Sequence, residues 1–270
     1  MALPSPAPDR TCLVTGASSG IGIELARELA GRGHGVCLVA RSVDRLAEVA
    51  EDLADAGVRV EVVPTNLSSR SERADLPARV AELGLSVDVL VNNAGLSTSG
   101  AVHASDPEAE LNMIEVDVAA VADLCSRFLP AMVERGRGAV LNVASVGAFQ
   151  PVPGQAGYGA SKAFVLSYTH ALRGELHGTG VVASVLCPGP VETGFGATAG
   201  ITREESARSL PGFLWETPEA VARVGVDGLA RNRAVSVPGP ANRAASLLGH
   251  LTPRSLLVPL LAGRHPRLRT

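Results

Sequence analysis

Short apolar runs alternate with longer amphipathic segments along most of this chain. We predict strands at the apolar runs Thr11–Thr15, Val36–Ala40, Arg59–Pro64, Val87–Val91, Ala139–Ala144, Val181–Leu186 and Ala234–Val237. We predict helices at the segments Gly20–Arg32, Val43–Ala56, Ser69–Leu83, Pro107–Arg135, Gly157–Leu176 and Pro218–Arg231. A strand followed by a helix, repeated, predicts parallel strands joined by crossover helices. We therefore expect an α/β fold, a doubly wound parallel sheet with helices on both faces, which binds ligands beyond the carboxyl ends of its strands.

The same pattern predicts one domain. A length of 270 residues fits a single large α/β domain, and no shift in composition marks a second one. We expect a flexible N-terminus over residues 1–9, the main domain over residues 10–240 and a C-terminal extension over residues 241–270. Residues 192–216 interrupt the alternation, and their Gly, Thr and Ser content predicts a mobile substrate loop with a short helix.

Composition and charge argue against several classes of function. A net charge of −3 and an aromatic share of 3% give no reason to expect a nucleic-acid partner. No uncharged apolar run approaches the roughly 18 residues of a membrane-spanning helix, and the N-terminus lacks the pattern of a signal peptide. The cysteines share no metal-ligand spacing, so we expect no metal site and buried, reduced thiols in a cytoplasmic protein. They are Cys12, Cys37, Cys125 and Cys187.

A glycine-rich turn follows the first predicted strand. It reads Thr15-Gly16-Ala17-Ser18-Ser19-Gly20-Ile21-Gly22 and opens the next predicted helix. Glycines let a backbone approach a pyrophosphate closely, and the free N–H groups at the start of a helix face its negative charge. Taken alone, the same residues would also fit a plain tight turn between a strand and a helix.

The spacing T-G-x-x-x-G-x-G resembles that of the short-chain dehydrogenase/reductase family. Asn92-Asn93-Ala94-Gly95, just past the fourth predicted strand, matches a second motif of that family. In the family this segment props the central sheet and lies beside the cofactor. The resemblance covers nearly all of residues 10–240, and it implies a Rossmann-type fold with a nicotinamide dinucleotide cofactor.

The end of the second predicted strand favours NADP(H) over NAD(H). Relatives that prefer NAD usually carry an acid here, which hydrogen-bonds the ribose hydroxyls. Ala40 takes that place and Arg41 follows, so a 2′-phosphate would meet a guanidinium, whose fork suits phosphate. The alternative for Arg41 is a solvated surface side chain. After the third predicted strand, Asn66 and Leu67 match family positions that would contact adenine.

Ser145, Tyr158 and Lys162 form the candidate catalytic group. Tyr158 and Lys162 stand at positions i and i+4 and share one helix face, so the phenol and the ammonium can converge. A nearby cation favours phenolate and lowers the pKa of the tyrosine. By the resemblance, Tyr158 would be the general acid in reduction and the base in oxidation. Lys162 would lower the pKa of Tyr158 and bind the nicotinamide ribose, and Ser145 would position the carbonyl.

The segment after the sixth predicted strand completes the cofactor site implied by the resemblance. It reads Pro188-Gly189-Pro190-Val191-Glu192-Thr193, and in the family the residues matching Val191 and Thr193 flank the nicotinamide carboxamide. The full set of residues implied to hold the cofactor is Gly16, Ser18, Ser19, Gly20, Ile21, Gly22, Arg41, Asn66, Leu67, Asn93, Ala94, Gly95, Tyr158, Lys162, Pro188, Gly189, Val191 and Thr193.

One catalytic position departs from the family pattern. The family usually carries Asn in the fourth helix, where it helps hold a water against the catalytic lysine. Here Asp117 occupies that position. An ionised Asp cannot donate a hydrogen bond, and at about 7 Å it would favour protonated Lys162 and disfavour phenolate Tyr158. The proton relay is therefore open, and the alternative is an Asp117 that is protonated or turned into solvent.

The residues expected around the substrate are mostly apolar and include no cluster of Arg or Lys, which favours a neutral or hydrophobic substrate. They are Leu96, Val146, Phe149, Gln150, Val152, Phe195, Phe213 and Trp215. Ordinary packing within loops is the alternative for each of them.

The end of the chain is basic and amphipathic. No acidic residue follows Asp227, while seven arginines accumulate among interleaved leucines. We interpret this end as a helical cap over the substrate loop or as a subunit contact, and an anionic membrane surface is the other option. The resemblance also implies a homo-oligomer, a dimer or a tetramer, paired through the predicted helices Pro107–Arg135 and Gly157–Leu176.

Together these features predict an NADP(H)-dependent oxidoreductase that interconverts a carbonyl and an alcohol on a small neutral or hydrophobic molecule. A non-catalytic NADP-binding sensor or scaffold protein is the alternative. Asp117 is the only feature in favour of that alternative, whereas Ser145, Tyr158 and Lys162 argue against it.

Overall fold

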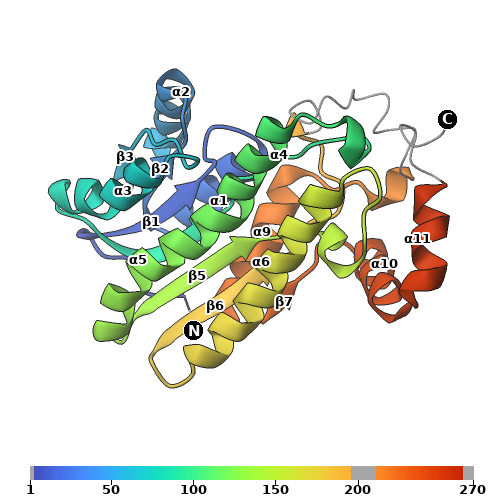
Figure 1. The fold of residues 1–270 in the computed structure, drawn as a ribbon. Helices are drawn as coiled ribbons and strands as arrows, with labels where there is room; N and C mark the ends of the chain where they lie inside the picture. Colours follow the sequence, from blue (N-terminus) through green and yellow to red (C-terminus); the bar gives the residue numbers. More distant parts are fainter. Residues whose placement is uncertain (1–2, 196–210, 264–270) are drawn as a thin grey trace.

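The computed structural model describes residues 3–195 and 211–263. Within them, seven parallel strands form one sheet in the order β3-β2-β1-β4-β5-β6-β7 (Figure 1). The strands are β1 (Arg10–Thr15), β2 (Gly35–Val39), β3 (Val60–Val62), β4 (Ser86–Asn92), β5 (Gly138–Val143), β6 (Val181–Leu186) and β7 (Val235–Ser236). The order reverses between β1 and β4, which is where doubly wound sheets bind their ligands. All the strands expected from the sequence are present, with β3 and β7 shorter than predicted.

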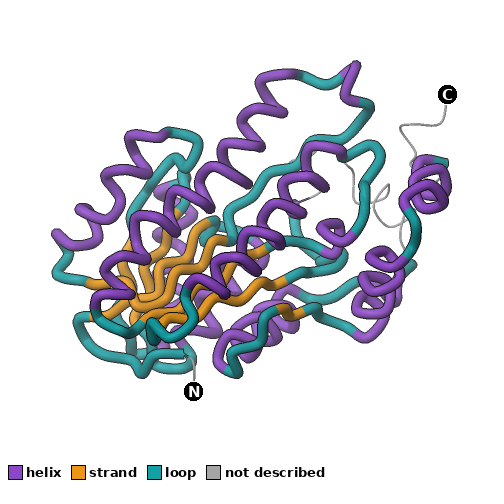
Figure 2. The backbone as a smooth tube through the Cα atoms, turned by 60° about the horizontal axis from the view of Figure 1, so that its bottom comes forward, coloured by secondary structure: helices purple, strands orange, loops and turns teal. Residues whose placement is uncertain are grey.

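Helices cover both faces of the sheet (Figure 2). They are α1 (Gly20–Ala30), α2 (Val43–Leu53), α3 (Arg70–Glu82), α4 (Pro107–Ile114), α5 (Ala120–Glu134), α6 (Ala156–Glu175), α9 (Pro218–Ala230), α10 (Pro240–Leu251) and α11 (Arg254–Ala262). One core joins the sheet to α1, α2 and α9, and a second joins it to α3, α5 and α6. Both faces of the strands are therefore buried, which is why their sequences are almost continuously apolar.

The helix starts follow from local sequence. Ser42, Ser69 and Thr217 each accept a hydrogen bond from a backbone N–H in the first turn of α2, α3 and α9, respectively. Such caps satisfy donors that have no partner within the helix. No side chain caps α1, whose N-cap is Ser19. The N–H groups at the start of α1 are therefore not taken up by a capping side chain.

The helix predicted over Pro107–Arg135 is present, but it is not α-helical along its whole length. A single π-helical turn, Glu115–Ala119, separates α4 from α5. A π turn adds a residue to the helical repeat and so rotates the side chains on either side of it. Asp117 lies in this turn and is fully buried, so the interruption falls at the position where the sequence departs from the family pattern it resembles.

The C-terminal extension begins with two helices, α10 and α11, beyond the β7 edge of the sheet (Figure 1). A short 3-10 turn, η4 (Val146–Phe149), lies against α10, and a second, η5 (Gly212–Leu214), is tied to it by a hydrogen bond from Asn242 Nδ2 to the Leu214 carbonyl. Most of the predicted substrate loop, residues 196–210, lies outside the described residues, as do residues 264–270. Among the helices described, none is long and apolar enough to cross a membrane.

Candidate active site

The glycine-rich turn packs directly against the segment that follows β4. Gly16 has a φ of +67°, and a Cβ placed there would lie 2.8 Å from the Ala94 Cα. A Cβ on Gly22 would overlap the Gly16 carbonyl and the Asn93 side chain. Glycine is required at Gly16 because its backbone is left-handed and closely approached, and at Gly22 because the close approach leaves no room for a side chain. The turn therefore stays open toward the N-terminus of α1.

Thr15 and Asn93 hold these two segments together. The Thr15 hydroxyl accepts hydrogen bonds from the N–H groups of Asn93 and Ala94 at 2.9 and 3.0 Å, and donates to the Val91 carbonyl at 3.1 Å. The Asn93 amide donates to the Thr15 carbonyl at 2.9 Å. The two motifs singled out in the sequence thus form one unit at the carboxyl ends of β1 and β4, as the order of the strands requires.

The residues after β2 and β3 lie at the same edge of the sheet. Arg41 is exposed just past β2 and makes no ion pair with any described carboxylate. Asn66 is held locally, because its Oδ1 accepts hydrogen bonds from the backbone N–H and the hydroxyl of Ser68. Leu67 is 6% exposed and belongs to the core on the α3 side. Of these three residues, Arg41 is therefore the one whose side-chain polar atoms are free to bind a ligand.

Tyr158, Lys162 and Ser145 converge beyond β5. Ser145 follows the strand and is the N-cap of η4, where its hydroxyl accepts a hydrogen bond from the Gly147 N–H at 3.1 Å. Tyr158 and Lys162 occupy the first turns of α6, and the Lys162 Nζ lies 5.6 Å from the centre of the Tyr158 ring. Lys162 is only 4% exposed. The i and i+4 spacing thus brings the phenol and the ammonium together as predicted.

Asp117 forms an ion pair with Lys162. The Lys162 Nζ lies 2.9 Å from the Asp117 Oδ2, and the Asp117 Oδ1 accepts a hydrogen bond from the Leu96 N–H at 2.7 Å. The expected separation of about 7 Å is wrong, because the π turn places Asp117 against α6. Gly95 closes the other side, where a Cβ would lie 3.1 Å from Nζ. The alternative of an Asp117 turned into solvent is also wrong.

The buried setting shifts the pKa values of both groups. Burial raises the pKa of the Tyr158 phenol above its usual value, and Asp117 adds to the rise, while Lys162 and a hydrogen bond from Ser145 oppose it. Burial by itself would lower the pKa of the Lys162 ammonium, but the Asp117 and Tyr158 charges outweigh it and the pKa is raised. The resting site therefore holds a neutral phenol beside a paired ammonium and carboxylate.

A buried polar network behind this group was not expected from the sequence. The Asn92 amide donates to the Asn142 Oδ1 at 2.8 Å, and the Asn142 amide donates to the Thr169 hydroxyl at 2.9 Å. These residues link β4, β5 and α6, and Asn142 is fully buried. The only signal in the sequence was a lone Asn inside the apolar run Ala139–Ala144. These hydrogen bonds tie the three elements together, although the Asn92 Oδ1 has no hydrogen-bond partner among the described residues.

Cys187 lies beneath the candidate serine. It follows β6, and its sulfur accepts a hydrogen bond from the Ser145 backbone N–H. Burial raises the pKa of this thiol to about 12, so it stays protonated. All four cysteines are buried and free, as the sequence indicated.

The residues proposed to face the substrate divide into two groups. The Phe195 ring lies 5.9 Å from the Tyr158 ring, and Val152 packs against Gly147 and Gly159, so these two side chains border the candidate catalytic group. Phe149 instead packs toward α6 and the β7 edge, and its carbonyl accepts hydrogen bonds from Arg254. The remaining candidates are half-buried, except Phe213, which is 73% exposed. They are Leu96, Val146, Gln150 and Trp215.

The segment after β6 returns to the glycine-rich turn. A Cβ on Gly20 would lie 2.9 Å from the Thr193 Cγ2, and Val191 pairs with Glu216 in an isolated bridge. Gly189 packs against the Asn242 side chain, which leaves no space for a Cβ there. Thr193 and Val191 are therefore beside the turn, while Gly189 has a packing role against α10.

The arrangement fits a dinucleotide. The glycine-rich turn, which we call the glycine cradle, leads into the start of α1. No side chain caps the N–H groups there. A helix start of this kind attracts a pyrophosphate. Arg41 offers an exposed cation one strand away. The candidate catalytic group lies at the same edge of the sheet after β5, which is two strands from β1 on the side away from Arg41. An extended molecule with a pyrophosphate in its middle and a reactive ring at one end matches this spacing.

The comparisons with known proteins agree with this geometry. A family model described as short chain dehydrogenase matches residues 10–204, so the chain belongs to the short-chain dehydrogenase/reductase family and is an oxidoreductase of that family. The ketoacyl reductase HetN of a Nostoc species is 35% identical over 230 residues, which cover 84% of this chain and 77% of that protein.

Solved structures show the same fold with both forms of the cofactor. A short-chain dehydrogenase from Sphingobium yanoikuyae in complex with NADPH is 33% identical, with a TM-score of 0.79 over 93% of this chain and 95% of that chain. A short chain dehydrogenase/reductase from Burkholderia phymatum in complex with NAD is 27% identical, with a TM-score of 0.80 over 93% of this chain and 94% of that one.

Proposed function

We propose that this protein is an NADP(H)-dependent reductase that interconverts a carbonyl and an alcohol on a neutral or hydrophobic substrate. The observation that carries the proposal is the convergence of Tyr158, Lys162 and Ser145 at the same sheet edge as the glycine cradle. A proton donor, a cation and a hydroxyl around one point are what carbonyl reduction requires of the protein. When bound, the nicotinamide supplies or accepts the hydride.

The preference for NADP(H) rests on Arg41. Its guanidinium is exposed, makes no ion pair with a described carboxylate, and follows Ala40 where an acid would repel a 2′-phosphate. The bound NADPH in the Sphingobium relative supports the same preference, and the Burkholderia relative binds NAD.

Each side chain has one task in reduction. Ser145 donates a hydrogen bond to the carbonyl oxygen and holds the substrate beside the phenol. Tyr158 gives its proton to that oxygen, and the Lys162 ammonium stabilises the phenolate that results. Asp117 keeps Lys162 charged and fixed in position. In oxidation the same proton moves in the opposite direction, so Tyr158 must first be deprotonated.

The substrate class follows from the side chains beside Tyr158. Phe195 and Val152 are apolar, and the residues proposed to face the substrate include no Arg or Lys. We therefore propose an uncharged or hydrophobic carbonyl compound. The HetN relative is a ketoacyl reductase, which makes ketoacyl compounds the first ones to try.

The test is NADPH oxidation with a panel of ketones, aldehydes and β-ketoacyl thioesters, on the wild type and Tyr158→Phe. The variant should lose turnover and keep NADPH binding, because it loses one hydroxyl and little shape. Tyr168→Phe is the matched control, since the chain has only one other tyrosine and its ring stacks on Phe164 at 5.4 Å. Turnover that survives in Tyr158→Phe, or fails equally in Tyr168→Phe, contradicts the proposed mechanism. Tight NADPH binding with no turnover on any compound would favour the sensor or scaffold alternative.

We propose a cytoplasmic location, for which the buried free cysteines are the support. We also propose a homo-oligomer paired through α4, α5 and α6, whose outer faces carry the exposed side chains of Leu111, Ile114 and Val133 on α4 and α5.

A further inference from the structure

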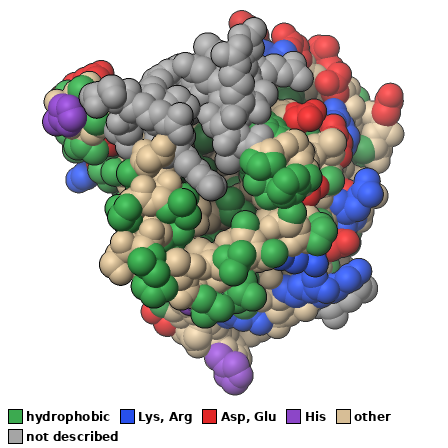
Figure 3. All heavy atoms as spheres, turned by 90° about the vertical axis from the view of Figure 1, so that its right-hand side faces the viewer, with side chains coloured by type: hydrophobic (Ala, Val, Ile, Leu, Met, Phe, Trp, Pro, Cys, Tyr) green, Lys and Arg blue, Asp and Glu red, His purple; other side chains and the backbone are tan. Residues whose placement is uncertain are grey.

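Helices α10 and α11 present an apolar surface to solvent. We call it the leucine face and define it by Leu247, Leu248, Leu251, Leu256, Val258 and Leu260. Its five leucines are between 53% and 68% exposed. Figure 3 faces this end of the molecule and shows hydrophobic side chains spread across it, with basic side chains gathered along one border. Exposed apolar patches of this kind mark surfaces that bind a partner.

The contacts that α11 makes within the described chain are too few to stabilise it. This helix has nine residues, and Leu257 is its one buried side chain. A helix of that length is marginal in water unless its apolar side is packed. Leu256 and Leu260 are more than half exposed within the described chain, so the packing of these two side chains must come from outside it.

The charges around the leucine face show what kind of cover fits. Residues 228–270 contain seven arginines and no Asp or Glu, although the whole chain has a net charge of −3. Four of these arginines are described, all exposed, and none lies within ion-pair distance of a described carboxylate: Arg231, Arg233, Arg243 and Arg254. By contrast, most arginines before residue 140 are paired with acids, as Arg32 is with Glu28 and Asp227. The partner of this corner must therefore be both apolar and anionic.

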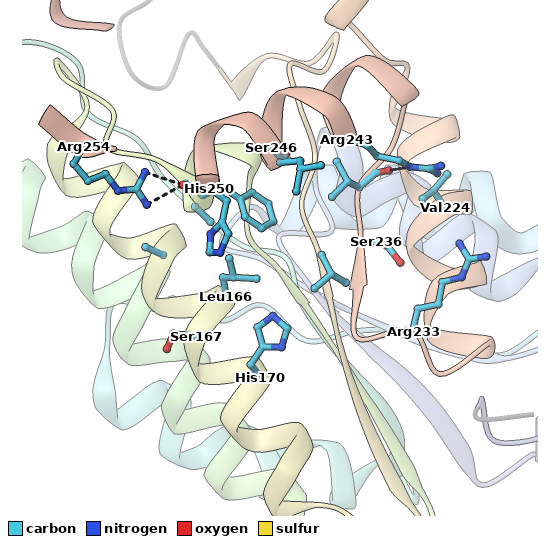
Figure 4. A pocket seen from close by; sticks show the side chains of 16 residues that line it. Leu166, Ser167, His170, Val224, Arg233, Ser236, Arg243, Ser246, His250 and Arg254 are labelled. Carbon is cyan, nitrogen blue, oxygen red and sulfur yellow. Dashed lines mark hydrogen bonds between the residues drawn. The ribbon is translucent and has the colours of Figure 1, made fainter. Parts of the chain in front are cut away.

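A groove of about 750 Å³ beside the leucine face carries the same chemistry (Figure 4). It runs between α6 and α10 over β7, with an apolar floor and no acidic residue among its lining. Arg243 and Arg254 stand on its rim and are anchored by hydrogen bonds to the carbonyls of Val237 and Phe149. Arg233 stands at one end and makes no side-chain hydrogen bond with the described residues. Fixed cations around an apolar surface suit anionic groups that lie above hydrocarbon.

We propose that the leucine face and its arginines bind the surface of an anionic lipid bilayer. The helices α10 and α11 lie in the interface, with the leucines in the acyl boundary and the arginines at the phosphates. A second copy of this chain fits less well, because a two-fold contact would bring the same unpaired arginines against each other. A bilayer can bury the leucines and also place anionic groups beside the arginines.

This binding would place the candidate active site beside the membrane. Arg254 at the start of α11 donates to the carbonyl of Phe149 in η4, next to Ser145, and Asn242 of α10 donates to the carbonyl of Leu214 in η5. The same helices thus form the leucine face and brace the walls of the site. If the proposed function holds, a hydrophobic carbonyl compound could reach Tyr158 from the lipid. The binding itself does not depend on catalysis.

The test is sedimentation of the full chain with vesicles of phosphatidylcholine alone and of phosphatidylcholine mixed with phosphatidylglycerol. The wild type should bind the mixed vesicles at least about tenfold better than the neutral ones. Most of this binding should disappear in about 1 M salt, where the screening length falls to about 3 Å. A chain that stays in the supernatant with the mixed vesicles overturns the proposal.

Two pairs of variants separate the apolar from the charged contribution. Leu251→Asp with Leu256→Asp should weaken binding about tenfold or more. Val43→Asp with Val102→Asp makes the same change of charge at apolar positions that are also more than half exposed, and it should bind like the wild type. Arg233→Gln with Arg243→Gln should lose the preference for phosphatidylglycerol, and Arg27→Gln with Arg59→Gln, which removes acid-paired arginines, should keep it.

Folding and assembly are checked on the same samples. NADPH binding and circular dichroism identify a variant that has failed to fold, and Leu251→Ser with Leu256→Ser then replaces the Asp pair. Equal vesicle binding by the leucine variants and the wild type overturns the proposal. So does light scattering in which the leucine variants turn an oligomer into a monomer while wild-type vesicle binding is absent, because the leucine face is then a contact between copies.

Discussion

The Lys162 ammonium lies 2.9 Å from the Asp117 carboxylate, and both side chains are buried. Most of the proposed catalytic chemistry is affected by this one contact. The carboxylate holds Lys162 protonated, and its charge opposes formation of phenolate at Tyr158. Reduction starts from neutral Tyr158 and suits this arrangement, whereas oxidation starts from phenolate and is opposed by it.

Asp117→Asn should shift the pH dependence of alcohol oxidation. The pKa of Tyr158 is raised in the wild type, first by burial and then by the Asp117 charge among other causes. Oxidation needs the deprotonated phenol, so its rate should rise with pH through that pKa. Loss of the carboxylate charge should move the rising limb to lower pH by about one unit. The pH profile of kcat for the alcohol measures the shift, and an unchanged limb would mean that Asp117 carries no charge in the working enzyme.

Lys162→Met should destabilise the fold as well as slow the reaction. It leaves the Asp117 carboxylate buried without its counter-charge, which costs about 3–5 kcal/mol of unfolding free energy. The double variant Lys162→Met with Asp117→Asn should recover most of that loss, because no buried charge then remains and Asn can still accept the Leu96 N–H. Urea unfolding of the three proteins measures the difference. Equal stability of the single and double variants would show that the ion pair does not contribute to folding.

Arg41→Ala should weaken NADPH binding and leave NADH binding nearly unchanged. A charge-assisted hydrogen bond to the 2′-phosphate is worth about 1.5–3 kcal/mol, or about 10- to 150-fold in affinity. Titration of both cofactors against the wild type and the variant gives the four dissociation constants. Wild-type values that are equal for the two cofactors, or tighter for NADH, would reject the preference for NADP(H).

Gly22→Ala should abolish dinucleotide binding, because its Cβ would overlap the Gly16 carbonyl and close the cradle. Gly174→Ala is the control: Gly174 lies in α6 with nothing within 4 Å of the added Cβ, so the variant should be more stable by about 0.5–1 kcal/mol. Cofactor titration and thermal unfolding distinguish the two effects. NADPH affinity that survives in Gly22→Ala would mean that the cofactor does not use this turn.

Light scattering at low micromolar concentration should show an oligomer. The exposed apolar side chains of Leu111, Ile114 and Val133 on α4 and α5 would be covered by pairing. Leu111→Arg should then shift the population toward a smaller species, and NADPH binding should be unaffected because Leu111 is outside the cradle. A wild type that is purely monomeric would rule out the oligomer.

The order of strands and helices could be predicted because it depends on local periodicity. Each strand is buried on both faces, so its sequence is apolar along its length, as in Val181–Leu186. Tyr158 and Lys162 could be paired from sequence for the same reason, since a helix brings positions i and i+4 together wherever it occurs. Asn93 and the glycine-rich turn could be placed near each other because parallel strands end at one edge.

The π turn and its consequences could not be predicted in this way. An extra residue in one turn leaves the apolar pattern of Pro107–Arg135 almost unchanged, so the sequence favours a single helix. The contact between Asp117 and Lys162 depends on that turn and on how the turn and α4 pack against α6. The hydrogen-bond network of Asn142 could not be predicted either, because one polar residue in an apolar run does not show which side chains pack against it.

The sequence by itself determined the family, the order of the elements and the identity of the candidate catalytic residues, since all three are encoded in short spacings along the chain. Only the tertiary structure decided that Asp117 is an ion-pair partner of Lys162 and that the leucines of α10 and α11 are exposed. The physical reason is the same in both cases. Whether a charged side chain is paired, or an apolar one buried, depends on which distant segments pack against it, and amphipathic periodicity shows that a helix has an apolar side without showing what covers that side.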